Sequence, residues 1–339
     1  MDGYAVAASA IAQTPVTLPV SAVIAAGATQ IGELARGCAA KIMTGSPIPP
    51  GADCVVPVED TTAFGDHVTI ASSRRPGEFI REAGSDVRAG QPLVPTNVPL
   101  APRHLAAIAA AGITAVDVRR RPRVAIITSG DELVPAGQDL RPGQLYDSNG
   151  TALATSFEAN GADVVRVTHT PDDPVTLRTL LDECADIADV IVTSGGVSMG
   201  DFEVVKETLA PLGGSFVKVA MQPGGPQGLS VYRDVPVLSF PGNPVSTLVS
   251  FVVFAQPNIR EAAGLPAIPP ATRRLAGTIN SIDGKRQFVR GRYTAAGIEP
   301  LAGTGSHLVA GLAWADALIV IGESDTRIAE GTDVEILPL

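Results

Sequence analysis

The sequence is short of basic residues, aromatic residues and cysteine, and two of these shortages exclude classes of protein. Its 25 Lys and Arg face 35 Asp and Glu, a formal net charge of −10, whereas nucleic-acid binding needs a concentrated positive surface. Its three cysteines, Cys38, Cys54 and Cys184, are scattered and form no CxxC pair, which argues against a disulfide framework and a zinc site. We therefore expect a cytoplasmic protein that has no nucleic-acid partner.

Long apolar runs are also missing. The longest, near residues 248–255, is far too short to cross a bilayer, and no basic segment followed by an apolar one marks a secretory signal. The sequence has no GxxxxGK[ST] motif, which excludes a P-loop NTPase. Its four histidines lie in no nucleophile motif, so we expect structural roles for them. We expect no membrane partner.

Glycine and proline, in contrast, are plentiful, at 35 and 28 residues, which predicts many turns and short strands. The chain of 339 residues exceeds the size at which a single core keeps growing. Residues 1–118 predict a β-rich N-terminal region that ends in a helix at 102–111 and a strand at 115–119. The clearest strands predicted before that helix are residues 17–24, 54–58, 67–70 and 79–81.

Residues 121–264 alternate strands with longer helices, which predicts an α/β domain with a doubly wound, mostly parallel sheet. The basic cluster just before it, residues 119–123, is interpreted as a domain junction. Residues 271–339 return to short strands and predict a small β-barrel or sandwich. The predicted strands are residues 124–128, 163–168, 190–193, 216–221 and 235–240, then 274–279, 287–293, 317–321 and 333–336. The predicted helices are residues 151–160 and 174–188, and two that begin at 202 and 244.

Three strands of the α/β region run into polar loops that contain glycine: TSGDE (128–132), TSGGVSMGD (193–201) and FPGNPVS (240–246). Each loop alone is also compatible with a tight turn whose glycines supply backbone freedom, and Asp201 could cap the following helix. The carboxyl ends of parallel strands meet at one sheet edge, where backbone N–H groups and hydroxyls can hold a phosphate. The three loops together therefore predict an anion pocket. Its candidate residues are Ser129, Gly130, Ser194, Gly195, Gly196, Ser198, Pro241, Gly242, Asn243, Pro244 and Ser246.

Acidic residues accompany these loops. Mg²⁺ prefers one or two protein carboxylates plus water and phosphate oxygens, so Glu132 and Asp172 are candidate metal ligands. Asp173, directly before a proline, is expected to be the N-cap of the next helix, and Asp147 is compatible with a turn residue.

Taken together and in order, these motifs resemble the molybdopterin molybdenumtransferase family, of the MoeA and gephyrin E-domain type. The resemblance implies an inserted domain in the N-terminal region, a molybdopterin-binding α/β domain and a C-terminal β-barrel, in a homodimer. The implied reaction inserts molybdate into adenylylated molybdopterin with Mg²⁺ and releases AMP. The shared segments include MDGYAV (1–6), KIMTGSPIPPGADCVV (41–56), GEFIREAGSDVRAG (77–90), GQLYDSNG (143–150), DDP (172–174) and the three loops.

The resemblance also implies roles for single residues. It assigns catalytic roles to Asp2, Thr44, Asp86, Glu132 and Asp172. Asp2 and Thr44 are implied to reach the α/β domain of the other subunit, so that the active site is shared. The molybdopterin adenylyltransferase and the molybdoenzymes that receive the product are further implied partners.

Two departures from the family leave alternatives open. The family has several dozen residues before MDGYAV, so we expect the chain to be truncated at its start. The family's KPGKP loop is here QPGGP, so Gln222 and Gly225 replace two lysines beside Gly224. Weaker molybdate binding is expected unless Arg233, Arg274 or another cation compensates. The alternative is that the backbone N–H groups of Gly224 and Gly225, with Ser246, suffice as a neutral anion nest. A non-catalytic molybdopterin-binding paralogue or scaffold, and the preceding adenylyltransferase, are the alternative functions.

Overall fold

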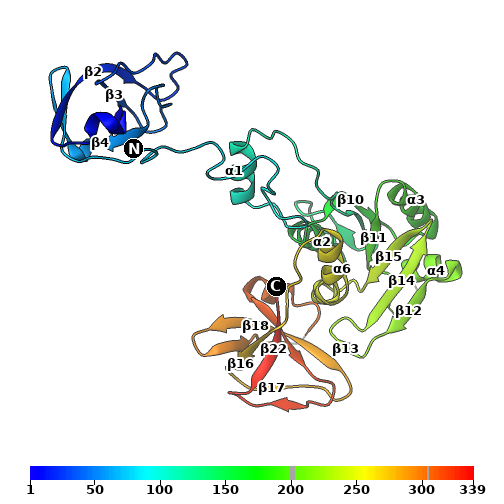
Figure 1. The fold of residues 1–339 in the computed structure, drawn as a ribbon. Coiled ribbons are helices and arrows are strands. Elements are labelled where there is room, and N and C mark those ends of the chain that lie inside the picture. Colours follow the sequence, from blue (N-terminus) through cyan, green and yellow to red (C-terminus); the bar gives the residue numbers. More distant parts are fainter. Residues whose placement is uncertain (199–202, 304) are drawn as a thin grey trace. The chain divides into compact units, whose positions relative to one another are not determined.

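The computed structural model describes residues 1–198, 203–303 and 305–339, which form two compact units, Met1–Val94 and Pro95–Leu339 (Figure 1). The expected cap Asp201 lies outside the described residues. No helix in the described part of the chain combines the length and the apolar character that crossing a membrane requires.

The first unit is a β-structure built on a six-stranded sheet of order β4-β1-β3-β2-β6-β5. Its core contains the buried side chains of Tyr4, Val6 and Ile70. The strand predicted at 79–81 is wrong: Phe79 lies in a turn with a φ of 61°. The elements are β1 (Gly3–Val6), β2 (Val16–Ile24), β3 (Ala39–Ile42), β4 (Cys54–Pro57), β5 (Thr61–Phe64) and β6 (His67–Ile70), with 3₁₀ turns at Ala8–Ile11 and Val58–Asp60.

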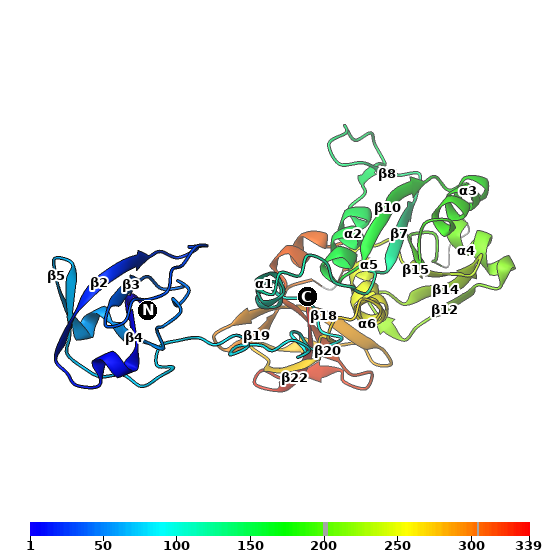
Figure 2. The same cartoon turned by 45° about the horizontal axis from the view of Figure 1, so that its top comes forward.

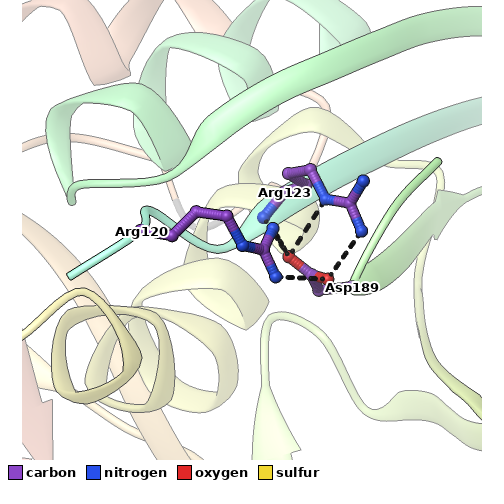
Figure 3. Close-up of polar contacts among 3 residues, drawn as sticks. All are labelled: Arg120, Arg123 and Asp189. Atoms are coloured by element: carbon purple, nitrogen blue, oxygen red, sulfur yellow. Dashed lines mark hydrogen bonds and ion pairs between the residues drawn. The ribbon is translucent and has the colours of Figure 1, made fainter.

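The second unit begins with α1 (Pro102–Ala110), close to the predicted helix, but the strand predicted at 115–119 is wrong because residues 113–122 are irregular. This segment is tied to the α/β domain by its basic cluster. Arg120 donates to both carboxylate oxygens of Asp189, and Arg123 donates to the same carboxylate from its guanidinium and its backbone N–H (Figure 3). The basic cluster thus fastens the start of the α/β domain.

The α/β domain is doubly wound around a sheet of order β10-β7-β11-β15-β14-β12. The first four strands are parallel, and the last two pair antiparallel, which confirms the mostly parallel sheet. Strand β14 was not predicted. The strands are β7 (Arg123–Ser129), β10 (Asp163–Thr170), β11 (Val190–Ser194), β12 (Ser215–Lys218), β14 (Pro226–Tyr232) and β15 (Val235–Phe240).

Helices cover both faces of this sheet because neighbouring residues of β7 point to opposite sides. Val124 and Ile126 pack with α2 (Asn149–Ala159), α5 (Pro244–Ser250) and its continuation through a π-helix (Phe251–Ala255) into α6 (Gln256–Ala262). Ala125 and Ile127 pack with α3 (Pro174–Ala185) and α4 (Val204–Leu209) on the other side. Figure 2 shows α2 and α3 on opposite sides of β7 and β10.

The C-terminal strands form a barrel. Strands β19, β18, β20, β22 and β16 pair in that order, and a bridge from Leu275 to Ile298 closes the ring. Segment 274–279, predicted as one strand, is split between β16 and β17, because the chain turns at Gly277 (φ 142°). The strands are β16 (Ala271–Arg274), β17 (Ile279–Asn280), β18 (Arg286–Thr294), β19 (Gly297–Pro300), β20 (Ala317–Ile321), β21 (Arg327–Ile328) and β22 (Asp333–Pro338).

One short strand joins the α/β domain to the barrel. Segment 216–221, predicted as one strand, is divided between two strands. Its first part belongs to β12 of the sheet, and its end belongs to β13 (Met221–Gln222). β13 pairs parallel with β18 of the barrel. This pairing places the barrel beside the carboxyl edge of the sheet. The remaining elements are β8 (Leu133–Val134), β9 (Leu145–Tyr146) and 3₁₀ turns at Ala210–Leu212 and Val309–Trp314.

Candidate active site

A cavity of about 1130 Å³ opens at the carboxyl edge of the parallel strands in the second unit. Loops that follow β7, β11 and β15 form its wall, together with residues 218–226 and part of the barrel. Every candidate residue of the predicted anion pocket lines this cavity, as do Glu132 and Asp172. The structure therefore brings the three polar loops together, as the strand order predicts.

Close packing explains why the second loop needs its first glycine. Gly195 has a φ of 104°, and a Cβ atom there would lie 2.6 Å from both the carbonyl oxygen and the Oγ of Ser129. Any side chain would therefore strain the backbone and push the first and second loops apart. The loop backbone is left bare, which suits close approach by a phosphate.

A buried hydrogen-bond network holds the floor of the cavity. Asn149 donates from Nδ2 to Ser194 Oγ (3.0 Å) and to the carbonyl oxygen of Gly242 (2.6 Å). Thr247 Oγ1 lies 3.2 Å from Ser194 Oγ and donates to the carbonyl oxygen of Pro241. Sequence reasoning treated the Ser194 hydroxyl as a ligand donor, but here it joins the second and third loops to the start of α2.

Carboxylates also line the cavity. The Glu132 carboxylate folds back against Gly130, since a Cβ atom there would lie 2.6 Å from Glu132 Oε2. Partial burial raises the pKa of Asp172, a backbone hydrogen bond with Asp131 partly offsets this, and the negative charges of Asp131, Glu132 and Glu203 raise it further. Carboxylates that repel one another beside a phosphate cradle suit a cation.

This donor set fits Mg²⁺, although the described residues contain no group of three His, Cys, Asp or Glu placed to hold a metal by themselves. Mg²⁺ needs only one or two protein carboxylates when phosphate oxygens and water complete its shell. Glu132 and Asp172 can supply these two oxygens. When bound, the ion would neutralise charge on the phosphate groups.

Two neighbouring acids serve the fold. Asp173 accepts from the N–H and the hydroxyl of Thr176 and caps α3, which lowers its pKa and confirms the expected cap. Asp147 accepts from the N–H groups of Asn149 and Gly150 at the start of α2, so it does more than shape a turn. These bonds orient the helix that carries Asn149.

The QPGGP loop lies between the sheet and the barrel. Gln222 Oε1 accepts a hydrogen bond of 2.8 Å from Nε2 of buried Gln287 in β18. Arg233, one of the two arginines expected to compensate, binds Asp182 and Asp186 instead, and neither it nor Arg274 is among the residues of the cavity wall. The lysines found in that wall are Lys218 and Lys285.

The barrel contributes a further loop to the wall. Gly305, Ser306 and His307 line the cavity, and the carbonyl oxygen of Ser306 accepts from the N–H of Val245 in the first turn of α5. The expectation of a purely structural role for His307 is therefore not supported by its position. No sequence signal places this loop, because it reaches the sheet edge only through the packing of the barrel.

Asp2, Thr44 and Asp86 belong to the first unit. Asp2 Oδ1 accepts from the backbone N–H of Thr44 (2.7 Å) and from its hydroxyl (2.9 Å), and these bonds lower the pKa of Asp2. Two residues singled out from motifs 42 positions apart are thus direct partners. Asp86 is exposed in the segment that follows the sheet.

Asn149 and Lys218 are the main cavity residues that sequence reasoning missed. The sequence does contain a feature that could have identified Asn149, because the DSNG segment follows a turn and begins a helix of the α/β domain. No such feature identifies Lys218, since the antiparallel return of β14 against β12 was not predicted.

Three family models together match most of the chain. Residues 1–112 match the MoeA N-terminal region (domain I and II), 125–261 a probable molybdopterin binding domain and 272–339 the MoeA C-terminal region (domain IV). Molybdopterin molybdenumtransferase 2 of Mycobacterium tuberculosis is 41% identical over 354 residues, covering 100% of this chain and 87% of the relative. A relative from Nostoc, molybdopterin molybdenumtransferase, is 37% identical over 100% of this chain and 82% of its own length. The crystal structure of a molybdopterin biosynthesis MoeA protein from Pyrococcus horikoshii superposes with a TM-score of 0.81 at 32% identity, covering 100% of this chain and 86% of that one.

Proposed function

Because the chain belongs to the MoeA family of molybdopterin molybdenumtransferases, we propose that its cavity is where molybdate enters adenylylated molybdopterin and AMP is released. The chain is a transferase of molybdenum cofactor biosynthesis. The observation that carries the assignment of the site is the joining of a bare phosphate cradle and an acidic cluster in one cavity.

Different residues of the cavity bind different parts of the substrate. The glycine loops after β7, β11 and β15 let the phosphate groups approach the backbone closely. The N–H groups of Gly130, Gly195 and Ser198 already donate within the fold, so the hydroxyl of exposed Ser198 supplies a side-chain donor. Glu132 and Asp172 would hold Mg²⁺, which would neutralise charge on the phosphate groups. An oxygen of water attacks the AMP phosphorus as the P–O bond to the pterin phosphate breaks, and AMP leaves with that oxygen. Molybdate forms two bonds to the dithiolene sulfurs and gives up one oxygen, which leaves as water with the two dithiolene protons.

We further propose that the protein works as a homodimer. By the family resemblance, Asp2, Thr44 and Asp86 complete the active site of a second copy, and their place in a separate compact unit is compatible with this arrangement. We also propose that the chain divides into regions at residues 1–118, 121–264 and 271–339 and that it works in the cytoplasm. Its proposed partners are the adenylyltransferase and the molybdoenzymes.

The neutral QPGGP loop is the observation that favours the second candidate, a paralogue that binds molybdopterin without turnover. Against it, Lys218 and Lys285 supply positive charge to the same cavity. The preceding adenylyltransferase has the least support, because the β-rich regions match MoeA regions.

One assay separates the candidates. The protein is incubated with adenylyl-molybdopterin and Mg²⁺, with and without molybdate, and AMP is measured. AMP release that depends on molybdate supports insertion. Binding without AMP release supports the paralogue, and formation of adenylyl-molybdopterin from ATP and molybdopterin supports the adenylyltransferase.

A further inference from the structure

Lys218 sits at the base of the QPGGP loop. It is the last residue of β12 and pairs directly with Pro226 of β14. The N–H of the next residue, Val219, donates to the carbonyl oxygen of Gly225 at 2.7 Å. The strand pair and this hydrogen bond fix the position of the Lys218 backbone relative to the loop. Its side chain is exposed and lines the cavity.

Gly225 lies beside the aliphatic stem of Lys218. A Cβ atom at position 225 would lie 3.9 Å from Lys218 Cγ and 3.5 Å from the carbonyl oxygen of Val219, both ordinary contact distances. Gly225 is also not among the glycines with positive φ. A side chain is therefore tolerated at 225, and it would begin in contact with the aliphatic stem of Lys218. The two positions serve the same part of the cavity.

The cavity wall carries more acidic than basic residues. The wall of the cavity carries the acids Glu132, Asp147, Asp172 and Glu203, whereas the substrates of the proposed function, molybdate and a phosphoanhydride, are anions. The ammonium of Lys218 forms no ion pair within the described parts of the chain. An unpaired ammonium at the wall of a partly open cavity attracts such anions.

We propose that Lys218 binds the anionic substrate in place of the cation that residue 225 lacks. This inference rests on the proposed function, because it takes molybdate as the anion. The loop itself is neutral, because Gln222, which accepts a hydrogen bond from Gln287, and Gly225 carry no charge. Position 218 then carries the charge at this end of the cavity.

The test compares Lys218→Met, Gly225→Lys and the double variant by calorimetric titration with molybdate alone and by AMP release. Lys218→Met keeps the length of the stem and removes the charge. It should weaken molybdate binding about tenfold, or about 1.4 kcal/mol, and should reduce the dependence of binding on ionic strength. Adding Gly225→Lys to Lys218→Met should restore most of the affinity, because the new side chain begins beside the stem of residue 218 and brings an ammonium back to the same wall of the cavity. Lys206→Met, which removes a lysine outside the cavity wall, is the control and should bind like the wild type.

Three results would overturn the proposal. If the wild type binds molybdate and releases AMP, and Lys218→Met binds molybdate equally well, then Lys218 does not bind the substrate, and the proposed function still holds. A loss that Gly225→Lys does not rescue would show that the two positions do not share a site. If the wild type neither binds molybdate nor releases AMP, the proposed function fails and the role of Lys218 fails with it.

Discussion

Asp172 and Asp173 are adjacent in the sequence, yet their carboxylates have different surroundings. Asp173 is bonded to Thr176 at the start of α3, and this bonding lowers its pKa. Asp172 faces Asp131, Glu132 and Glu203, and partial burial and their charges raise its pKa. One acid completes a helix, and the other is available to a cation.

This difference predicts separate effects of substitution. Asp172→Ala and Glu132→Ala should leave the unfolding midpoint unchanged and bind molybdopterin normally. Both should slow AMP release on the order of a hundredfold and raise the Mg²⁺ concentration needed for half-maximal rate, because a metal ion supplies several kcal/mol of charge stabilisation.

Asp173→Ala is the matched control. Loss of the helix cap should cost about 1 kcal/mol of unfolding free energy, measured by urea titration, with an unchanged Mg²⁺ requirement. Wild-type AMP release and Mg²⁺ requirement in Asp172→Ala and Glu132→Ala would remove both residues from the chemistry.

The sequence predicts these residues unevenly. Asp173 could be identified as a cap because a helix pattern with an initial proline follows it. Ser194, in contrast, was assigned to the ligand from its loop alone, whereas its hydroxyl bonds with Asn149 and Thr247. Partners that come from other strands decide which way a hydroxyl is used, and one segment of sequence does not contain them.

Among the elements, the parallel strands were the most predictable, because buried apolar runs ending in glycine loops alternate with helices. β14 is difficult to predict because Gly228 and the initial proline weaken its strand pattern, although the strand itself is continuous. The segment 216–221 was placed in one strand because its apolar pattern runs through the change from sheet to barrel. The strand at 226–232 and the break within 216–221 both depend on pairing with other strands, which the local sequence pattern does not show.

The attachment of residues 119–123 gives a prediction about an element boundary. Hydrogen bonds from Arg120, partly offset by desolvation, and further bonds from Arg123 hold the pKa of Asp189 well below its ordinary value of 3.8. Asp189→Asn should therefore lower the free energy of unfolding at pH 7 by on the order of 1 kcal/mol, since the carboxylate is partly exposed.

The sign of the pH dependence follows from the lowered pKa. The ionised carboxylate stabilises the fold fully above pH 3.8, and this contribution is lost as pH falls through the lower folded value. Urea titrations should thus give the same difference between wild type and Asp189→Asn at pH 7 and pH 5, and a smaller difference below pH 3.8. A difference that grows as the pH falls would contradict the role of these hydrogen bonds.

For the whole molecule, the residues of the proposed reaction are divided between two compact units, with Asp2 and Thr44 in one and Glu132 and Asp172 in the other. If the active site is shared between subunits, Asp2→Ala and Glu132→Ala should each be inactive alone. Mixed dimers of the two should recover part of the AMP release, because one site of each mixed dimer contains only intact residues.

The control mixes Asp172→Ala with Glu132→Ala. These residues lie in the same unit, so every site of their mixed dimers keeps one defect and activity should stay low. Equal recovery in both mixtures, or none in either, would contradict an active site built from two subunits.

The central claim is that the cavity of the second unit couples the loss of AMP to the insertion of molybdenum. The most direct measurement is a single turnover of adenylyl-molybdopterin with Mg²⁺ and molybdate, in which released AMP and pterin-bound molybdenum are quantified in the same sample. The account predicts that the two appear in equal amounts and at the same rate, and that neither appears when molybdate is left out. AMP release without molybdenum on the pterin, or at an unchanged rate without molybdate, would contradict it.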